Sequence, residues 1–256
     1  MLFTSLASGS TGNCALYIGG GARILVDAGM STRFIAACLR ELGLELRDLT
    51  HVLITHNHGD HIAALPVLGK HTGAELVCSE DTYNHLREPW QRCAVFEPGE
   101  SFALAGCDIV TFPTPHDAPG SCGYVLGSGS ERLGYCTDLG EITMEVFTAL
   151  SGCPTLFLES NHDLDMLKHG PYPPSLKRRI LGPTGHLSNT RCAQGVVALA
   201  KTGTRRFILG HLSQENNTPA LALRESETAL EAAGAAIAEV DISVAPVAGV
   251  ALPVRC

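Results

Sequence analysis

The sequence lacks long hydrophobic runs, and no stretch approaches the ~20 apolar residues that a membrane-spanning helix requires. Its first five residues, Met1 to Ser5, have neither the positive charge nor the apolar segment of a signal peptide. Charged residues are also sparse, at 17%, and the net charge is -8 with histidine neutral. This balance argues against a broad basic face for nucleic acid, although it allows a local one. We expect neither a signal peptide nor a membrane partner.

No Cys-x-x-Cys motif is present, although the chain contains ten cysteines. Most of them lie in apolar runs, such as Leu76-Val77-Cys78, where a thiol acts as a small core side chain. This distribution indicates reduced thiols in a cytoplasmic protein rather than a disulfide framework. The 256 residues are 45% hydrophobic and show no fixed-period repeat, low-complexity segment or clear linker. We therefore expect one domain that spans residues 1–256.

The most informative stretch reads Thr55-His56-Asn57-His58-Gly59-Asp60-His61. It follows a short apolar run, residues 52–54, which predicts a buried strand. His56 and His58 are two residues apart, so in extended backbone their side chains leave the same face. Both imidazoles can therefore bind one metal ion.

Gly59 permits a tight turn, which directs Asp60 and His61 toward a second metal ion nearby. Nitrogen and oxygen ligands at a rigid strand end, with a carboxylate beside the attacking water, suit a two-metal hydrolytic site. The alternative is a polar loop that contains three histidines by chance.

Three more predicted strands end in a histidine or an aspartate. His116 lies at the end of one strand, where a third imidazole ligand for the first metal is expected. Its neighbour Asp117 is a weaker candidate for a metal ligand. Asp138 follows the strand at residues 132–136, and His211 follows the one at residues 207–209. Considered alone, Asp138 is only an aspartate at a strand end. Another such residue, Asp27, is either support for a metal ligand or a turn residue.

The pattern His-x-His-x-Asp-His resembles that of the metallo-β-lactamase superfamily of binuclear hydrolases. This resemblance implies an α/β fold of the αββα sandwich type, with two mixed β-sheets flanked by helices and the metals at one edge. It also implies that His56, His58 and His116 bind one metal and that Asp60, His61 and His211 bind the other. Asp138 is implied to bind both. Imidazoles with carboxylates suit two Zn²⁺ or Mn²⁺ ions, and the sequence does not choose between them.

The second half of the chain narrows the resemblance. Glu159-Ser160, Gly185-His186-Leu187-Ser188-Asn189 and the segment around His211 are similar to motifs of the tRNA-processing endonuclease RNase Z. The YycJ/WalJ family of bacterial metallo-β-lactamase-fold proteins is a closer match. That match includes the stretches at residues 8–13, 159–163, 185–189 and 211–217. The family is associated with 5′-to-3′ exonuclease activity on double-stranded DNA.

The resemblance implies three catalytic residues: Asp60, Glu159 and His186. Asp60 orients the nucleophile, and Glu159 orients a protonated His186 beside the leaving oxygen. In the alternative, His186 only caps a loop. Donors in a glycine-containing loop and at a helix N-terminus are expected to bind substrate phosphates. They are Ser8, Ser10, Thr11, Asn13, Ser188 and Asn189. The alternatives are an ordinary hairpin turn and a helix N-cap.

We therefore predict a metal-dependent phosphodiesterase, specifically a 5′-to-3′ exonuclease on double-stranded DNA. The interval between Asp138 and His211 is too short for the inserted domain of the RNase J group, so short loops must hold the nucleic acid. Basic residues near the site either contact phosphates or belong to solvated helix faces: Lys168, Lys177, Arg178, Arg179, Arg191. The alternatives are a hydrolase of a small phosphodiester, thioester or lactone, and a non-catalytic metal-binding relative. The sequence does not determine the oligomeric state.

Overall fold

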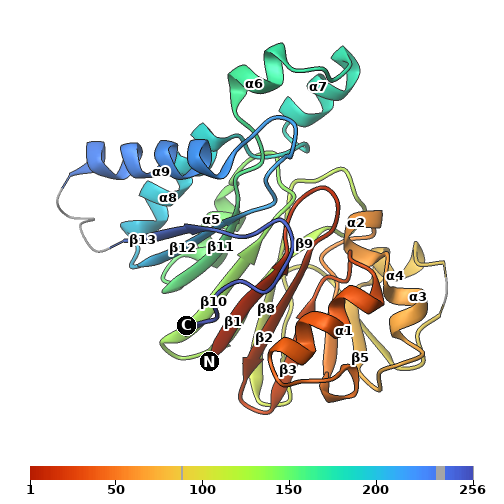
Figure 1. Cartoon of the computed structure of the whole chain (residues 1–256). Helices are drawn as coiled ribbons and strands as arrows, with labels where there is room; N and C mark the ends of the chain where they lie inside the picture. Colours follow the sequence, from red (N-terminus) through yellow and green to blue (C-terminus); the bar gives the residue numbers. More distant parts are fainter. Residues whose placement is uncertain (88, 235–239, 256) are drawn as a thin grey trace.

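Two seven-stranded β-sheets form the centre of the structure, a computed structural model that describes residues 1–87, 89–234 and 240–255 (Figure 1). The first sheet is antiparallel from β14 to β3 and parallel from β3 to β6. Its strands, in spatial order, are β14 (Val254–Arg255), β1 (Leu2–Ala7), β2 (Cys14–Gly19), β3 (Ala22–Val26), β4 (His51–Leu53), β5 (Glu75–Ser79) and β6 (Cys93–Phe96).

The second sheet mirrors this plan, because it is antiparallel from β7 to β10 and parallel from β10 to β13. Parallel neighbouring strands need crossover connections, which usually contain a helix. The connections after β10, β11 and β12 each contain one. The spatial order is β13 (Asp241–Val244), β12 (Arg206–Gly210), β11 (Thr155–Glu159), β10 (Glu131–Cys136), β9 (Cys122–Ser128), β8 (Cys107–Pro113) and β7 (Ser101–Leu104).

The two sheets pack face to face through a core to which both contribute aromatic side chains. Phe3 of β1 lies edge-on to Phe157 of β11, with ring centroids 5.6 Å apart, and Phe157 stacks on Tyr135 of β10. Aliphatic side chains from both sheets complete this layer, including Ile24 and Ile208. Burial of this apolar surface stabilises the contact between the sheets.

Helices cover the outer face of each sheet (Figure 1). Ile35 and Leu39 of α1 and Leu68 of α3 are buried against the first sheet, and a separate cluster joins α5, α8 and α9 to the second sheet. The helices are α1 (Thr32–Glu41), α2 (Gly59–Ile62), α3 (Leu65–Leu68), α4 (Glu80–Asn84), α5 (Met144–Leu150), α6 (Leu164–His169), α7 (Pro174–Leu181), α8 (Asn189–Ala200) and α9 (Pro219–Ala233), with a 3₁₀ turn at Leu46–Asp48.

Three separate hydrophobic clusters thus lie between four layers, and the predicted αββα sandwich is confirmed. Among the described residues, none of the helices has the length and hydrophobicity needed to span a bilayer. The strands that carry the predicted ligands end at a common edge of the sandwich, because residues that follow β4, β8, β10 and β12 meet there.

Candidate metal centre

His56 and His58 lie in the short connection between β4 and α2, as the sequence predicts. Together with His116, which follows β8, they form a group whose nearest ring nitrogens all lie within 4.8 Å of one another. His58 Nδ1 is 3.2 Å from His116 Nε2. Burial, followed by the neighbouring His61, lowers the pKa of His56 well below its usual value. The ring is therefore neutral and offers a lone pair to a metal.

Asp60, His61 and His211 form a second group with the same spacing limit of 4.8 Å. Asp60 and His61 belong to the first turn of α2, whereas His211 directly follows β12. His61 Nε2 lies 3.5 Å from Asp60 Oδ2. The turn at Gly59 places Asp60 and His61 on α2, and the two groups adjoin there, because the ring centroids of His56 and His61 are 4.1 Å apart.

Asp138 lies between the two groups. Its Oδ2 atom is 3.2 Å from His61 Nε2 and 3.3 Å from His211 Nδ1. Its Oδ1 atom is 3.8 Å from His116 Nε2 on the other side. Asp138 is 2% exposed, so the carboxylate is removed from water and depends on partners inside the protein.

Among the described residues, several buried polar atoms at this centre have close neighbours but form no hydrogen bond with them, an arrangement that suits metal ligands. They are His56 Nε2, Asp138 Oδ2 and His211 Nδ1. Buried polar groups are almost always satisfied, and a cation bound between these convergent lone pairs would satisfy them. Imidazole and carboxylate donors of this kind suit Zn²⁺ or Mn²⁺.

Three residues at the strand ends have an unusual backbone conformation. Asp27, Asp138 and His211 have φ angles of 60°, 58° and 55°, in the left-handed region that few residues other than glycine adopt. Such backbone is typically retained where a site requires it. The backbone N–H of His211 donates to Ser8 Oγ at 2.7 Å, which stabilises this conformation.

Asp27 supports His61 from outside the centre. Its Oδ2 atom lies 2.9 Å from His61 Nδ1, and its Oδ1 atom accepts from the backbone N–H of Thr55 at 2.9 Å. A carboxylate at one ring nitrogen fixes the orientation of the imidazole and strengthens the other nitrogen as a ligand. The sequence predicts that Asp27 either supports a metal ligand or is a turn residue, and these contacts favour the first role.

Glu159 and His186 form a close pair beside Asp138. The Nδ1 atom of His186 lies 2.7 Å from Glu159 Oε1 and 3.6 Å from Asp138 Oδ1. Burial opposes the charged form of His186, but the Glu159 carboxylate outweighs this effect and raises the pKa to about 9. His186 is therefore an imidazolium at neutral pH. Both residues also lie within ligand spacing of His211, so a deprotonated His186 would fit a metal ligand as well.

Glu159 is held rigidly. It is fully buried, and its Oε2 atom accepts from the backbone N–H of Leu139, one residue after Asp138. A second, longer bond comes from the N–H of Leu187, beside His186. Glu159 therefore links the backbone after β10 to the loop before α8.

The predicted phosphate-binding residues divide into two sets. Ser10 and Thr11 are exposed, at the tip of the loop between β1 and β2. Ser8 and Asn13 are buried: Ser8 accepts from His211, and Asn13 Oδ1 accepts from the N–H of Gly9. The loop thus presents two side chains outward and uses the others internally.

Ser188 and Asn189 are also buried. Ser188 is the N-cap of α8, where its Oγ accepts from the backbone N–H of Arg191, and Asn189 Oδ1 accepts from Ser160 Oγ at 2.8 Å. Their side-chain bonds are internal, as the helix-cap alternative predicts. The phosphate role stays a prediction, and exposed Ser10 and Thr11 are better placed for it.

Asp117, the weaker ligand candidate, has a partner that the sequence did not suggest. Its Oδ1 atom accepts from Arg179 Nη2 at 3.0 Å, and this contact with Arg179 lowers the pKa of Asp117. The same carboxylate lies 3.7 Å from His58 Nε2. Arg179 is therefore engaged at the rim of the centre, so it is less available for the phosphate contact considered for it.

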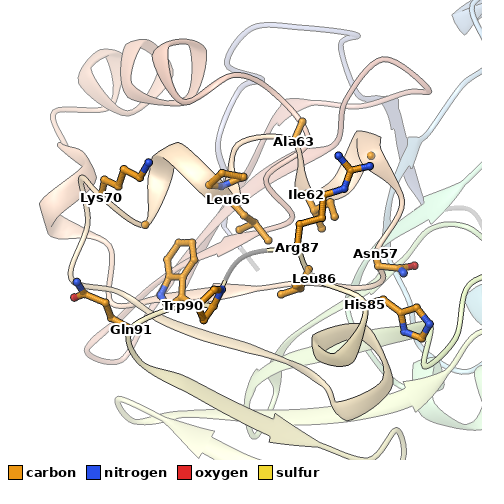
Figure 2. Close-up of a pocket in the computed structure, with 14 residues that line it drawn as sticks. Asn57, Ile62, Ala63, Leu65, Lys70, His85, Leu86, Arg87, Trp90 and Gln91 are labelled. Carbon is orange, nitrogen blue, oxygen red and sulfur yellow. The ribbon is translucent and has the colours of Figure 1, made fainter.

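A hollow of about 630 Å³ opens beside the histidine turn (Figure 2). Asn57 and Gly59 form one wall, and Leu65, Leu86 and Trp90 supply apolar surface. Lys70 and Arg87 add positive charge at its border. Figure 2 shows Asn57, His85 and Arg87 together on one side and Lys70 with Trp90 on the other.

Comparison with protein families gives a match to the β-lactamase superfamily domain over residues 22–212. The chain is 33% identical over 243 residues to the exodeoxyribonuclease YycJ of Bacillus anthracis, covering 93% of this chain and 92% of that protein. It is also 33% identical to the exodeoxyribonuclease WalJ of Streptococcus pneumoniae, over 86% of this chain and 84% of the relative.

Solved structures with the same fold include the metallo-β-lactamase fold protein YhfI from Bacillus subtilis. Its TM-score is 0.74 at 16% identity, with 98% of each chain covered. The short form of human tRNase Z has a TM-score of 0.65 at 16% identity, with 98% of this chain and 99% of that chain covered. At these identities the likeness shows the fold alone.

Proposed function

Because this chain belongs to the metallo-β-lactamase superfamily and is a metal-dependent hydrolase, we propose that it cleaves phosphodiester bonds in DNA. The observation that carries this proposal is the Glu159–His186 pair, whose imidazolium lies 3.6 Å from the central Asp138 carboxylate. The exodeoxyribonucleases that match most of the chain support the choice of DNA.

The proposed metal ligands follow the two groups of the centre. The residues that would hold one metal are His56, His58 and His116, and those for the other are Asp60, His61 and His211, with Asp138 shared. Two divalent ions held there would activate water near neutral pH and stabilise developing negative charge.

Three side chains have the remaining catalytic roles. Asp60 is one-quarter exposed, so it is accessible to accept a hydrogen bond from the attacking water and orient it. His186 donates its proton toward the departing oxygen, and Glu159 keeps the ring charged and aligned. General-acid assistance of this type contributes roughly 10²–10⁴-fold to the rate.

We also propose the finer features of the substrate and location. A 5′-to-3′ direction on double-stranded DNA rests on the sequence resemblance to the YycJ/WalJ family, and the matched relatives, which are named exodeoxyribonucleases, support DNA as the substrate. A cytoplasmic location is supported by the cysteines, because all nine in the described residues are free thiols.

The test compares four substrates with protein loaded with Mn²⁺ or Zn²⁺: 5′-phosphorylated duplex DNA, single-stranded DNA, bis(p-nitrophenyl) phosphate and a thioester. We expect mononucleotide release from the 5′ end of the duplex, and its loss in Asp138→Ala. Efficient thioester cleavage without release of nucleotides would contradict the proposal and favour a small-molecule hydrolase.

A further inference from the structure

A second hollow, of about 330 Å³, is lined in part by His186, whose Nδ1 atom also lies 3.6 Å from Asp138 Oδ1. It lies between the loop after β11 and the N-terminal part of α8. Among the described residues that line it there is no carboxylate, and its polar groups are His162, His186, Ser188, Thr190, Arg191 and Gln194. Thr190 already donates to Glu225, His186 is paired with Glu159, and Ser188 accepts from the N–H of Arg191. The side chains left to donate to an anion are therefore His162, Arg191 and Gln194.

His162 is the unexplained residue of this hollow. It is 1% exposed, and neither of its ring nitrogens has a hydrogen-bond partner among the described residues. An imidazole carries an N–H at one nitrogen at least, so the ring contains a buried donor without an acceptor. Such a group is destabilising unless a water or a ligand satisfies it.

The backbone fixes this ring at the hollow. The carbonyl oxygen of His162 accepts from the N–H of Asn189 at 2.8 Å, and a β-bridge pairs His162 with Ser188. These bonds join the residue to the start of α8, so the ring position is set by main-chain contacts. A ligand that the ring binds would therefore also lie near the helix N-terminus.

The helix and one arginine add positive potential. α8 has 12 residues, and its N-terminal turn presents the positive end of the helix dipole. Arg191 Nη1 donates to the carbonyl oxygen of Gly140 at 2.7 Å, which uses one of its five donors and holds the guanidinium beside the hollow. A planar guanidinium and a helix N-terminus both favour phosphate oxygens.

We propose that this hollow binds a phosphate group of the substrate backbone, with His162 and Arg191 as donors. The inference rests on the proposed nuclease function. His186 separates this phosphate from the one under attack, because it lines the hollow and also lies 3.6 Å from Asp138 Oδ1. The bound group is either the terminal 5′-phosphate, which sets the position of the cut, or an internal phosphodiester.

The experiment uses metal-loaded protein and the variants His162→Leu and Arg191→Gln, with His71→Leu as the control at an exposed histidine outside this hollow. KM and kcat are measured on 5′-phosphorylated duplex, on 5′-hydroxyl duplex and on bis(p-nitrophenyl) phosphate, which has no second phosphate. We expect KM for DNA to rise roughly 10-fold to 100-fold, the effect of losing a hydrogen bond to a charged group. The control should match the wild-type protein.

The two duplexes separate the sources of the phosphate. A loss confined to the 5′-phosphorylated duplex assigns the hollow to the terminal group, and an equal loss on both duplexes assigns it to an internal phosphate. Equal changes on DNA and on the small diester, in step with a lowered Tm, would overturn the proposal and make His162 a structural residue. Arg191→Gln, at an exposed side chain, keeps the test decisive if His162→Leu fails to fold.

Binding of inorganic phosphate gives a readout that does not depend on DNA cleavage. Phosphate should raise the Tm of the wild-type protein more than that of His162→Leu, since ligands that bind only the folded state stabilise it. If the wild-type protein does not cut DNA but this difference persists, the nuclease function fails and the hollow still binds phosphate. The absence of any difference overturns the phosphate site itself.

Discussion

The Nδ1 atom of His61 lies 2.9 Å from Oδ2 of Asp27, and both side chains are completely buried. The two residues are 34 positions apart, one at the end of β3 and the other in α2. This bond turns the opposite ring nitrogen, Nε2, toward Asp138 at 3.2 Å. A residue outside the predicted ligand set therefore determines how one of the proposed ligands faces the centre.

Replacing Asp27 by Asn should weaken metal binding at the His61 side. The amide keeps the shape but loses the charge that orients the imidazole, and loss of such support lowers affinity roughly 10-fold to 100-fold. Competition with a chelator measures the effect, and Asp241→Asn, at an exposed ion pair with Arg206, is the matched control. Unchanged affinity in Asp27→Asn would show that the orientation of His61 does not depend on this carboxylate.

Asp138→Ala should release both metals together. Asp138 is the proposed shared ligand, and its two oxygens face opposite groups of the centre. Elemental analysis after dialysis gives the metal content per chain. Two tightly held ions in this variant would exclude the shared role, and the loss of only one would assign Asp138 to a single site.

Activity should fall at high pH because of His186. Its pKa in the folded protein is about 9, above the 6.5 of a free histidine, so the imidazolium donor is present at neutral pH and lost as pH rises through about 9. The same sign holds for stability: the favourable contribution is complete below about 6.5 and disappears as pH passes the folded value. A profile of kcat/KM against pH and a series of Tm values test both statements.

Two variants separate the roles of this pair. Glu159→Gln removes the charge that raises the pKa of His186, so the fall of kcat/KM should move to lower pH. His186→Ala should retain its metals and lose roughly 10²–10⁴-fold in rate. Metal loss in His186→Ala would identify a ligand or a fold support, which its spacing to His211 also permits.

Ser188 should behave as a helix cap. Ser188→Ala removes the bond to the N–H of Arg191 and should destabilise the protein by ~1 kcal/mol, with equal changes on DNA and on a small phosphodiester. In contrast, Ser10→Ala with Thr11→Ala should raise KM for DNA and leave Tm nearly constant, because both side chains are exposed. A rise in KM for DNA alone in Ser188→Ala would restore the predicted phosphate role of that residue.

The sequence by itself determined the local positions from which the centre is built, and its resemblance to the metallo-β-lactamase superfamily implied the fold and the ligand set. Apolar runs that end in histidine or aspartate are local patterns, and a strand with its following turn is a local structure. All seven predicted ligands lie in the groups at one edge of the sandwich, and His116 and His211 reach it from the second sheet because the fold brings those strand ends there. Their metal-binding roles remain predictions.

Only the tertiary structure decided which side chains meet and which are withdrawn. Asp117 pairs with Arg179 across 62 positions, and the ring of His162 has no hydrogen-bond partner in the part of the chain that the structure describes. Ser188 has donor chemistry suited to phosphate, yet it is buried as a cap. Local sequence sets the chemistry of a side chain, but its partners and exposure depend on how helices from distant segments pack on the sheets.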